Sequence, residues 1–153
     1  MSKICVICVP SIIDNKNYFI SRIKQIVDHY GSGCFILEKI EEPFFDYNNS
    51  EFIISFSDSY VYDNCEMLLL PDNCTYNGKT NKTPFCDRMA MIRDVAAFLR
   101  QAAFHVELYV GDSGTEYDDY LCHKCRPYSI PDVMCEYLND SNFHAHNLHI
   151  VVE

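Results

Sequence analysis

One apolar run near the N-terminus constrains the fold more than any other feature of the chain. In the segment KICVICV, residues 3–9, six consecutive positions are apolar, and Pro10 follows directly. A continuous apolar run of this length is typical of a buried strand, whereas a half-exposed strand alternates apolar and polar residues. We therefore predict a buried strand at residues 3–9.

Three later stretches have the periodicity of amphipathic helices. The first spans residues 19–30 and stops at Gly31, a residue that favours helix ends. The second begins after Thr83 and Pro84, which we expect to act as its N-cap and its first-turn residue. The third is short and covers residues 129–138. The chain therefore has two main helices and a short third helix.

Further segments have the length and composition of strands. They lie at residues 34–40, 51–58, 65–70, 105–111 and 146–153. A length of 153 residues fits one domain. The order of elements predicts an α/β or α+β fold for residues 1–153, with a mixed central sheet of about six strands.

The charge of the chain is strongly negative and unevenly distributed. The formal net charge is −10, and residues 101–153 contain nine Asp or Glu but only two Lys or Arg. An acidic surface repels nucleic-acid phosphates and anionic membranes, and it attracts cationic surfaces. We therefore expect no nucleic-acid or membrane partner, and we expect a basic protein partner.

The cysteines and the N-terminal segment bear on the compartment. The first fifteen residues lack the apolar length and cleavage site of a signal peptide, and no run approaches the ~18 apolar residues of a membrane helix. We therefore predict a cytoplasmic protein in which the nine cysteines are reduced. Several of them, such as Cys5 and Cys8, fall in apolar segments and are expected to pack as small hydrophobic residues.

The tetrapeptide at residues 111–114, Gly-Asp-Ser-Gly, is similar to the nucleophile loop of trypsin-like serine proteases. Thr115 stands where those enzymes need a third glycine, so we interpret the tetrapeptide as a turn after a strand. The neighbouring acids do not form an EF-hand. Counted from Asp112, the sixth residue is Tyr117 and the twelfth is His123, where that loop requires Gly and Glu.

A Cys-x-x-Cys pair is the best metal candidate in the sequence. Structural zinc takes four Cys or His ligands, which here would be Cys122, Cys125, His144 and His146. The histidine spacing is not the usual helical one, and a chain of this size does not need a metal to fold. We therefore expect neither a metal nor another cofactor. A zinc- or thiol-dependent enzyme that uses Cys122, Cys125 and the C-terminal histidines remains the alternative.

Tyrosine is abundant, with eleven Tyr and no Trp, and several tyrosines stand beside acids. Tyrosine rings are enriched at protein interfaces, and carboxylates between them suit a surface that binds Arg and Lys. We expect the strand at residues 105–111 to present Glu107 and Tyr109 outward and the following loop to add further acids. The predicted partner-binding residues are Glu107, Tyr109, Asp112, Glu116, Tyr117, Asp118, Asp119 and Tyr120.

The second helix and the segment FHVELYVGDSGTEYDDY that follows it carry a resemblance to a known class of proteins. Over residues 83–120 the chain resembles immunity proteins of bacterial polymorphic toxin and contact-dependent growth inhibition systems. The resemblance implies a non-enzymatic protein that forms a one-to-one complex with a cognate basic toxin domain, often a nuclease. Its acidic surface would occlude the active site of the toxin. An acidic adaptor or nucleic-acid mimic outside toxin systems is a further alternative.

Overall fold

A computed structural model describes most of the regular elements of the chain. The described residues are 3–9, 15–30, 35–38, 52–56, 69, 72, 75–76, 79–80, 83–112, 120–139 and 146–153. The strands are β1 (Lys3–Val9), β2 (Phe35–Glu38), β3 (Phe52–Ser55), β4 (Thr75–Tyr76), β5 (Lys79–Thr80), β6 (Val106–Asp112), β7 (Tyr120–Cys125) and β8 (Asn147–Val152). The helices are α1 (Lys16–His29), α3 (Phe85–Gln101) and α4 (Ile130–Asn139), the last preceded by a 3-10 turn at Pro127–Ser129.

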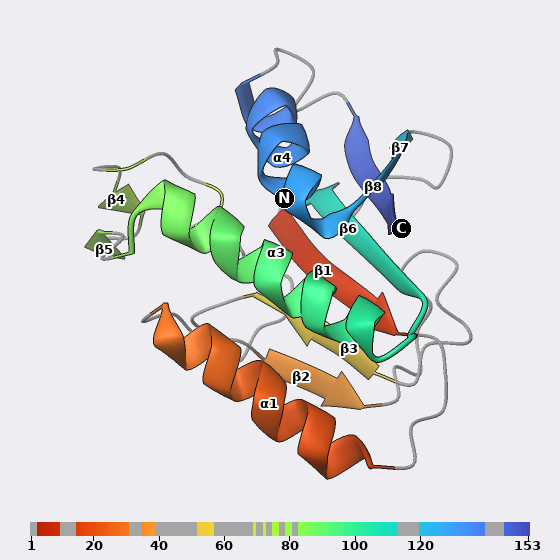
Figure 1. Ribbon diagram of the computed structural model, residues 1–153. Helices are drawn as coiled ribbons and strands as arrows, with labels where there is room; N and C mark the ends of the chain where they lie inside the picture. The colour runs from red at the N-terminus through yellow and green to blue at the C-terminus, as the bar shows by residue number, and fades with distance from the viewer. Residues whose placement is uncertain are drawn as a thin grey trace.

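Within the described residues, a six-stranded sheet has the order β2-β3-β1-β6-β8-β7. All neighbouring strands run antiparallel except β7 and β8, which are parallel, so the sheet is mixed. Helices α1, α3 and α4 lie on one face of this sheet (Figure 1). We call this the inner face and the opposite one the outer face. The mixed α and β class that the sequence predicts is confirmed.

Two strand assignments differ from the sequence-based expectation. Leu69 is helical, so the predicted strand at residues 65–70 is wrong at that position, and its other residues lie outside the described part. Residues 120–125 form strand β7, which is not among the strands that the sequence predicts. This strand alternates Leu121 and Cys125, which pack against the core, with the exposed Cys122 and Lys124. Its polar positions weaken the sequence signal, and its pairing with β8 supplies the stability.

Strand β1 lies in the interior of the sheet, between β3 and β6. All five residues of 5–9 are at most 3% exposed, which confirms the predicted buried strand. Cys5, Ile7 and Val9 face the helices and belong to the main core, as do the inward residues of β6 and β8. Cys5 and Cys8 therefore pack as hydrophobic residues, as expected.

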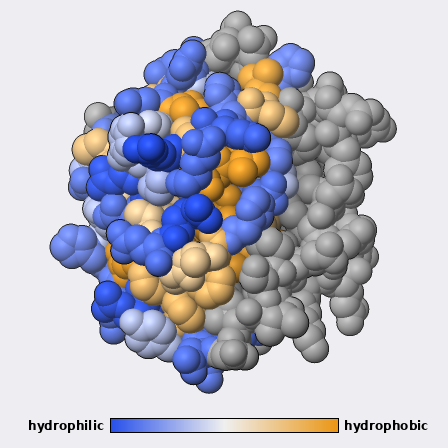
Figure 2. Space-filling model, turned by 45° about the vertical axis from the view of Figure 1, so that its right-hand side comes forward, coloured by the Kyte–Doolittle hydropathy of each residue, from blue (hydrophilic) through white to orange (hydrophobic). Residues whose placement is uncertain are grey.

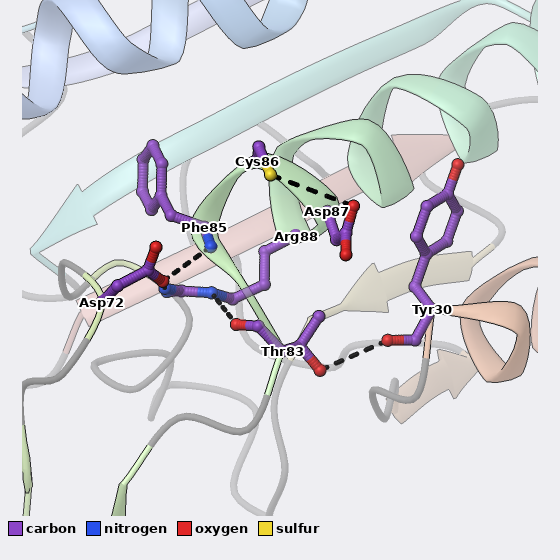
Figure 3. A network of polar contacts seen from close by, with 7 residues as sticks. All are labelled: Tyr30, Asp72, Thr83, Phe85, Cys86, Asp87 and Arg88. Carbon is purple, nitrogen blue, oxygen red and sulfur yellow. Dashed lines mark hydrogen bonds and ion pairs between the residues drawn. The ribbon is translucent and has the colours of Figure 1, made fainter.

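A polar network fixes the N-terminal end of α3 (Figure 3). Arg88 is 2% exposed; its Nε donates to the carbonyl of Thr83 at 3.0 Å, and a terminal nitrogen pairs with Asp72 at 3.1 Å. The same carboxylate accepts the backbone N–H of Phe85 at 2.8 Å. The burial of the guanidinium is thereby compensated by a charge partner and hydrogen bonds.

The predicted N-cap role of Thr83 is wrong. Pro84 occupies the N-cap position, without a side-chain cap, and Asp72 satisfies the N–H of Phe85 from outside the helix. The hydroxyl of Thr83 instead donates to the carbonyl of Tyr30 at 3.2 Å, which links the end of α1 to the start of α3 (Figure 3).

No helix within the described residues is long and apolar enough to cross a membrane. Figure 2 shows the molecule turned from the view of Figure 1 so that its right-hand side comes forward. The described surface there is largely hydrophilic, with smaller hydrophobic areas between the polar residues.

Candidate functional site

The outer face of β6, β8 and β7 carries a cluster of groups capable of acid–base or nucleophilic chemistry. Successive side chains of a strand point to opposite faces. The even-numbered residues of β6, from Val106 to Val110, pack in the core, so Glu107 and Tyr109 point to the outer face. In the sheet, Tyr109 pairs with His149, and His149 pairs with Cys122. We call Glu107, His149 and Cys122 the outer-face triad.

The triad is joined through both nitrogens of one imidazole ring. His149 Nε2 lies 2.9 Å from Glu107 Oε1, and His149 Nδ1 lies 3.8 Å from Cys122 Sγ. A carboxylate accepts hydrogen bonds, so a neutral His149 carries its proton on Nε2 and directs the lone pair of Nδ1 towards the thiol. The order is therefore carboxylate, imidazole, thiol, one group from each of three neighbouring strands.

The ring of His149 is also fixed in its plane. It stacks on Tyr109 with ring centroids 4.3 Å apart and an interplanar angle of 6°. Stacked pairs of this kind contribute about 0.5–1.5 kcal/mol beyond the area that they bury. The imidazole is thus held by a ring on one face and by polar groups at two edges.

Accessibility on the outer face rises from the middle of the sheet towards its edge. Val6 and Cys8 of β1 are at most 3% exposed, and the side chains of Glu107 and His149 are 26% and 19% exposed. Cys122, on the edge strand β7, is exposed. A reagent or partner from solvent therefore reaches the triad from the thiol end.

The triad favours a negative charge on Glu107. The hydrogen bond from His149 is the largest influence and lowers the pKa of the Glu107 carboxyl below its ordinary value, against the opposing effect of burial. His105, whose Nε2 lies 3.6 Å from the second carboxylate oxygen, acts in the same direction. Glu107 is consequently a carboxylate at neutral pH, consistent with its role as the acceptor of the Nε2 proton.

Of the predicted partner-binding residues, the structure places four. Glu107 and Tyr109 share the outer face, Asp112 is the last residue of β6, and Tyr120 is the first residue of β7. Glu116, Tyr117, Asp118 and Asp119 lie outside the described residues.

Tyr109 differs from expectation in its accessibility. It lies on the predicted face, but it is only 8% exposed because His149 stacks against it. The ring therefore contributes to the position of His149 and is not presented to solvent.

The structure does not bring the proposed zinc ligands together. Cys122 and Cys125 are three residues apart on one strand, so Cys122 lies on the outer face and Cys125 packs against the core on the inner face. His144 lies outside the described residues, and His146 accepts a hydrogen bond from Tyr137 through its backbone carbonyl at 2.6 Å. Among the described residues no group of three or more potential ligands could hold a metal ion.

His149 is one of the C-terminal histidines that the sequence offers as candidates, but its pairing with Glu107 and Tyr109 was not predicted. Its position in a C-terminal apolar strand was visible, but its neighbours were not, because strand β8 inserts between β6 and β7. The Tyr109–His149 and Cys122–His149 pairs join residues 40 and 27 positions apart, and only the sheet order reveals such pairs.

Gly111 belongs to the strand and not to a turn after it, because β6 continues to Asp112. Its φ is 146°, and a Cβ added there would lie 2.1 Å from Oδ1 of Asn147. The missing side chain makes room for that buried asparagine on the outer face. The glycine is thus explained by close packing, and the resemblance of residues 111–114 to a protease loop has no structural counterpart in the described part of the tetrapeptide.

Comparisons with protein-family models, with curated proteins and with solved structures found no match to this chain.

Proposed function

We propose that the chain is an immunity-type protein that binds a basic toxin domain one-to-one and occludes its active site. The observation that carries the proposal is the distribution of charge along β6 and the segment that joins it to β7. Residues 101–123 contain no Lys or Arg, whereas Glu107, Asp112, Glu116, Asp118 and Asp119 are all acidic. Such a concentration of one sign attracts a cationic partner and increases the rate of association.

The position of this acidic stretch supports the same proposal. Strand β6 carries the ionised Glu107, and the chain continues through Asp112 to the edge strand β7. The described ends of the acidic stretch therefore lie on β6 and on the edge strand β7. A cytoplasmic location, where such a protein would meet its toxin, is part of the proposal.

A double charge reversal tests the proposed surface. Asp118→Lys with Asp119→Lys should weaken binding to the toxin domain by about thirtyfold or more. Removal of one member of a buried charge pair at an interface typically costs ~2–5 kcal/mol of binding free energy. The matched control is Asp28→Lys with Glu136→Lys, which changes the net charge equally at two exposed positions on α1 and α4. This control should bind within about threefold of the parent, and equal weakening by both variants would show that overall charge and not this surface is responsible.

The partner itself must be identified first. Affinity purification of the tagged chain from its native cells, followed by mass spectrometry, should recover a basic protein in equimolar amount. That protein should arrest growth when it is expressed alone and should lose this effect when the chain is co-expressed. A captured partner that is harmless alone would contradict the immunity proposal. With the partner in hand, its binding to the chain can be measured by calorimetry at two salt concentrations.

A further inference from the structure

Of the outer-face triad, Glu107 alone belongs to the surface proposed to bind a toxin, yet the order of the three groups matches a requirement of nucleophilic catalysis. A thiol is a weak nucleophile until it loses its proton, and an adjacent imidazole oriented by a third group is the usual means of removing that proton. Cys122, His149 and Glu107 stand in this order, with contacts of 3.8 Å and 2.9 Å. The thiol is at the exposed end of the row, where a reagent can reach it.

We propose that Cys122 is a nucleophilic thiol, activated by His149, and a site of covalent modification by small carbon electrophiles. Glu107 is a positioning residue, since it acts on the thiol only through the imidazole. Its acceptance of the Nε2 proton leaves Nδ1 as the base that faces Sγ. The stack with Tyr109 keeps the ring in the plane that joins the other two groups.

The chemical step is a displacement at carbon. The proton of the Cys122 thiol passes to Nδ1 of His149, and the sulfur electron pair forms a bond to the electrophilic carbon. The bond from that carbon to its leaving group breaks, and the leaving group departs with the electron pair. The imidazolium, stabilised by the Glu107 carboxylate, then returns its extra proton to the leaving group or to water. With iodoacetamide the products are S-carbamidomethyl cysteine, iodide and a proton.

The charged and titratable groups around the imidazole agree with this assignment. Glu107 and His105 come from β6, and Lys124 lies on the outer face of β7, two positions beyond Cys122. Cys122 itself is exposed and faces the imidazole. The cysteine at position 125 has the opposite setting: burial is the main cause that raises the pKa of its thiol, and Glu153 adds to the effect. The two cysteines of the Cys-x-x-Cys pair therefore have different chemistry, and we assign the reactive role to Cys122 alone.

The test is the rate of alkylation of individual cysteines by iodoacetamide, followed by peptide mass spectrometry of the full-length protein. At about pH 7, His149→Gln should slow modification of Cys122 at least about tenfold, a modest loss for removal of a positioned base. The difference should nearly vanish at about pH 10, because hydroxide then deprotonates thiols without assistance. If His149→Gln only altered the local structure, the alkylation rate of Cys122 would change by the same factor at both pH values.

Cys86 supplies the internal control. It is also exposed, and its thiol contacts the carboxylate of Asp87 at 3.9 Å and not a histidine. Its rate should be the same in the parent and in His149→Gln. The two buried cysteines of β1 should stay unmodified in both proteins, which shows that the variant is folded. Glu107→Gln is the second variant, and it should slow Cys122 at about pH 7 in the same direction and leave Cys86 unchanged. If Cys122 in the folded His149→Gln protein reacts within about twofold of the parent, the proposal is wrong. If that variant does not fold, an unchanged rate in Glu107→Gln overturns it equally.

Discussion

The two faces of the same three strands, β6, β8 and β7, differ in what holds them together. On the inner face, Leu108 and Ile150 are completely buried beneath the helices. On the outer face, Glu107, His149 and Cys122 are joined by polar contacts and become more exposed towards the sheet edge. The strand period of two residues creates both faces from one stretch of sequence.

The difference indicates a division of roles between stability and chemistry. Burial of apolar area is worth about 25 cal/mol per Å², so the inner face supplies most of the stabilisation. Partly exposed polar contacts contribute little free energy, but they fix groups at defined distances. The inner face should therefore tolerate few changes, whereas the partly exposed positions of the outer face should accept substitutions that alter its reactivity and not its stability.

Adjacent residues of β8 offer the strongest test of this comparison. Ile150→Ala empties space in the core and should lower the free energy of unfolding by about 2–5 kcal/mol. Val151→Ala, on the outer face and only partly buried, should cost less than about 1.5 kcal/mol. Denaturant unfolding measures both. Equal losses at the two positions would show that the outer face is packed as tightly as the inner one.

The sequence was sufficient for features that depend on local periodicity. The buried strand β1, the helices α1 and α3 and the C-terminal strand β8 were all predicted, because their apolar residues repeat at strand or helix spacing. Strand β7 was missed because the exposed His123 stands between Leu121 and Cys125 on the same face and interrupts the apolar alternation. The Thr83 cap was wrong because Asp72, thirteen residues before Phe85, performs that function.

Gly111 is a point at which the outer face is sensitive to added volume. Gly111→Ala places a Cβ against the buried Asn147 and forces a side chain onto a backbone with φ of 146°. Overpacking of this kind costs about 1–3 kcal/mol, which the melting temperature should report as a decrease. The double variant Gly111→Ala with Asn147→Ala should recover part of the loss. No recovery would mean that backbone strain and not the asparagine is responsible.

The candidate site could be predicted only in part, for a physical reason. The alternation of β6 correctly placed Glu107 and Tyr109 on one face. Their shared partner, His149, comes from a strand whose neighbours depend on the whole sheet order. The Cys-x-x-Cys motif suggested a common site for two cysteines, but in a strand an odd spacing sends them to opposite faces. The local pattern determines the face on which a side chain lies, and long-range strand pairing determines which side chains become neighbours on that face.

The smallest expected effect is the pH dependence that Glu107 adds to stability. His149 lowers the pKa of Glu107 in the folded protein, so the folded state binds the proton less readily than the unfolded chain, whose carboxyl titrates near ~4.3. The stabilisation is therefore present above about pH 4.3 and is lost as the pH falls through the folded-state pKa. Because the side chain is 26% exposed and screened by solvent, its size should stay below about 1 kcal/mol.

The free energy of unfolding of Glu107→Gln, compared with the parent between about pH 5.5 and pH 3, isolates this contribution. The parent should be more stable at the upper end of the range, and the gap should close on acidification. Glu136→Gln, which removes an exposed carboxylate from α4, is the matched control and should show little gap at any pH. A gap for Glu107→Gln that stays constant or widens towards low pH would mean that the carboxylate charge is not what the contact with His149 stabilises. The outer-face triad would then hold together by packing alone, and the distinction between the two faces would reduce to their exposure.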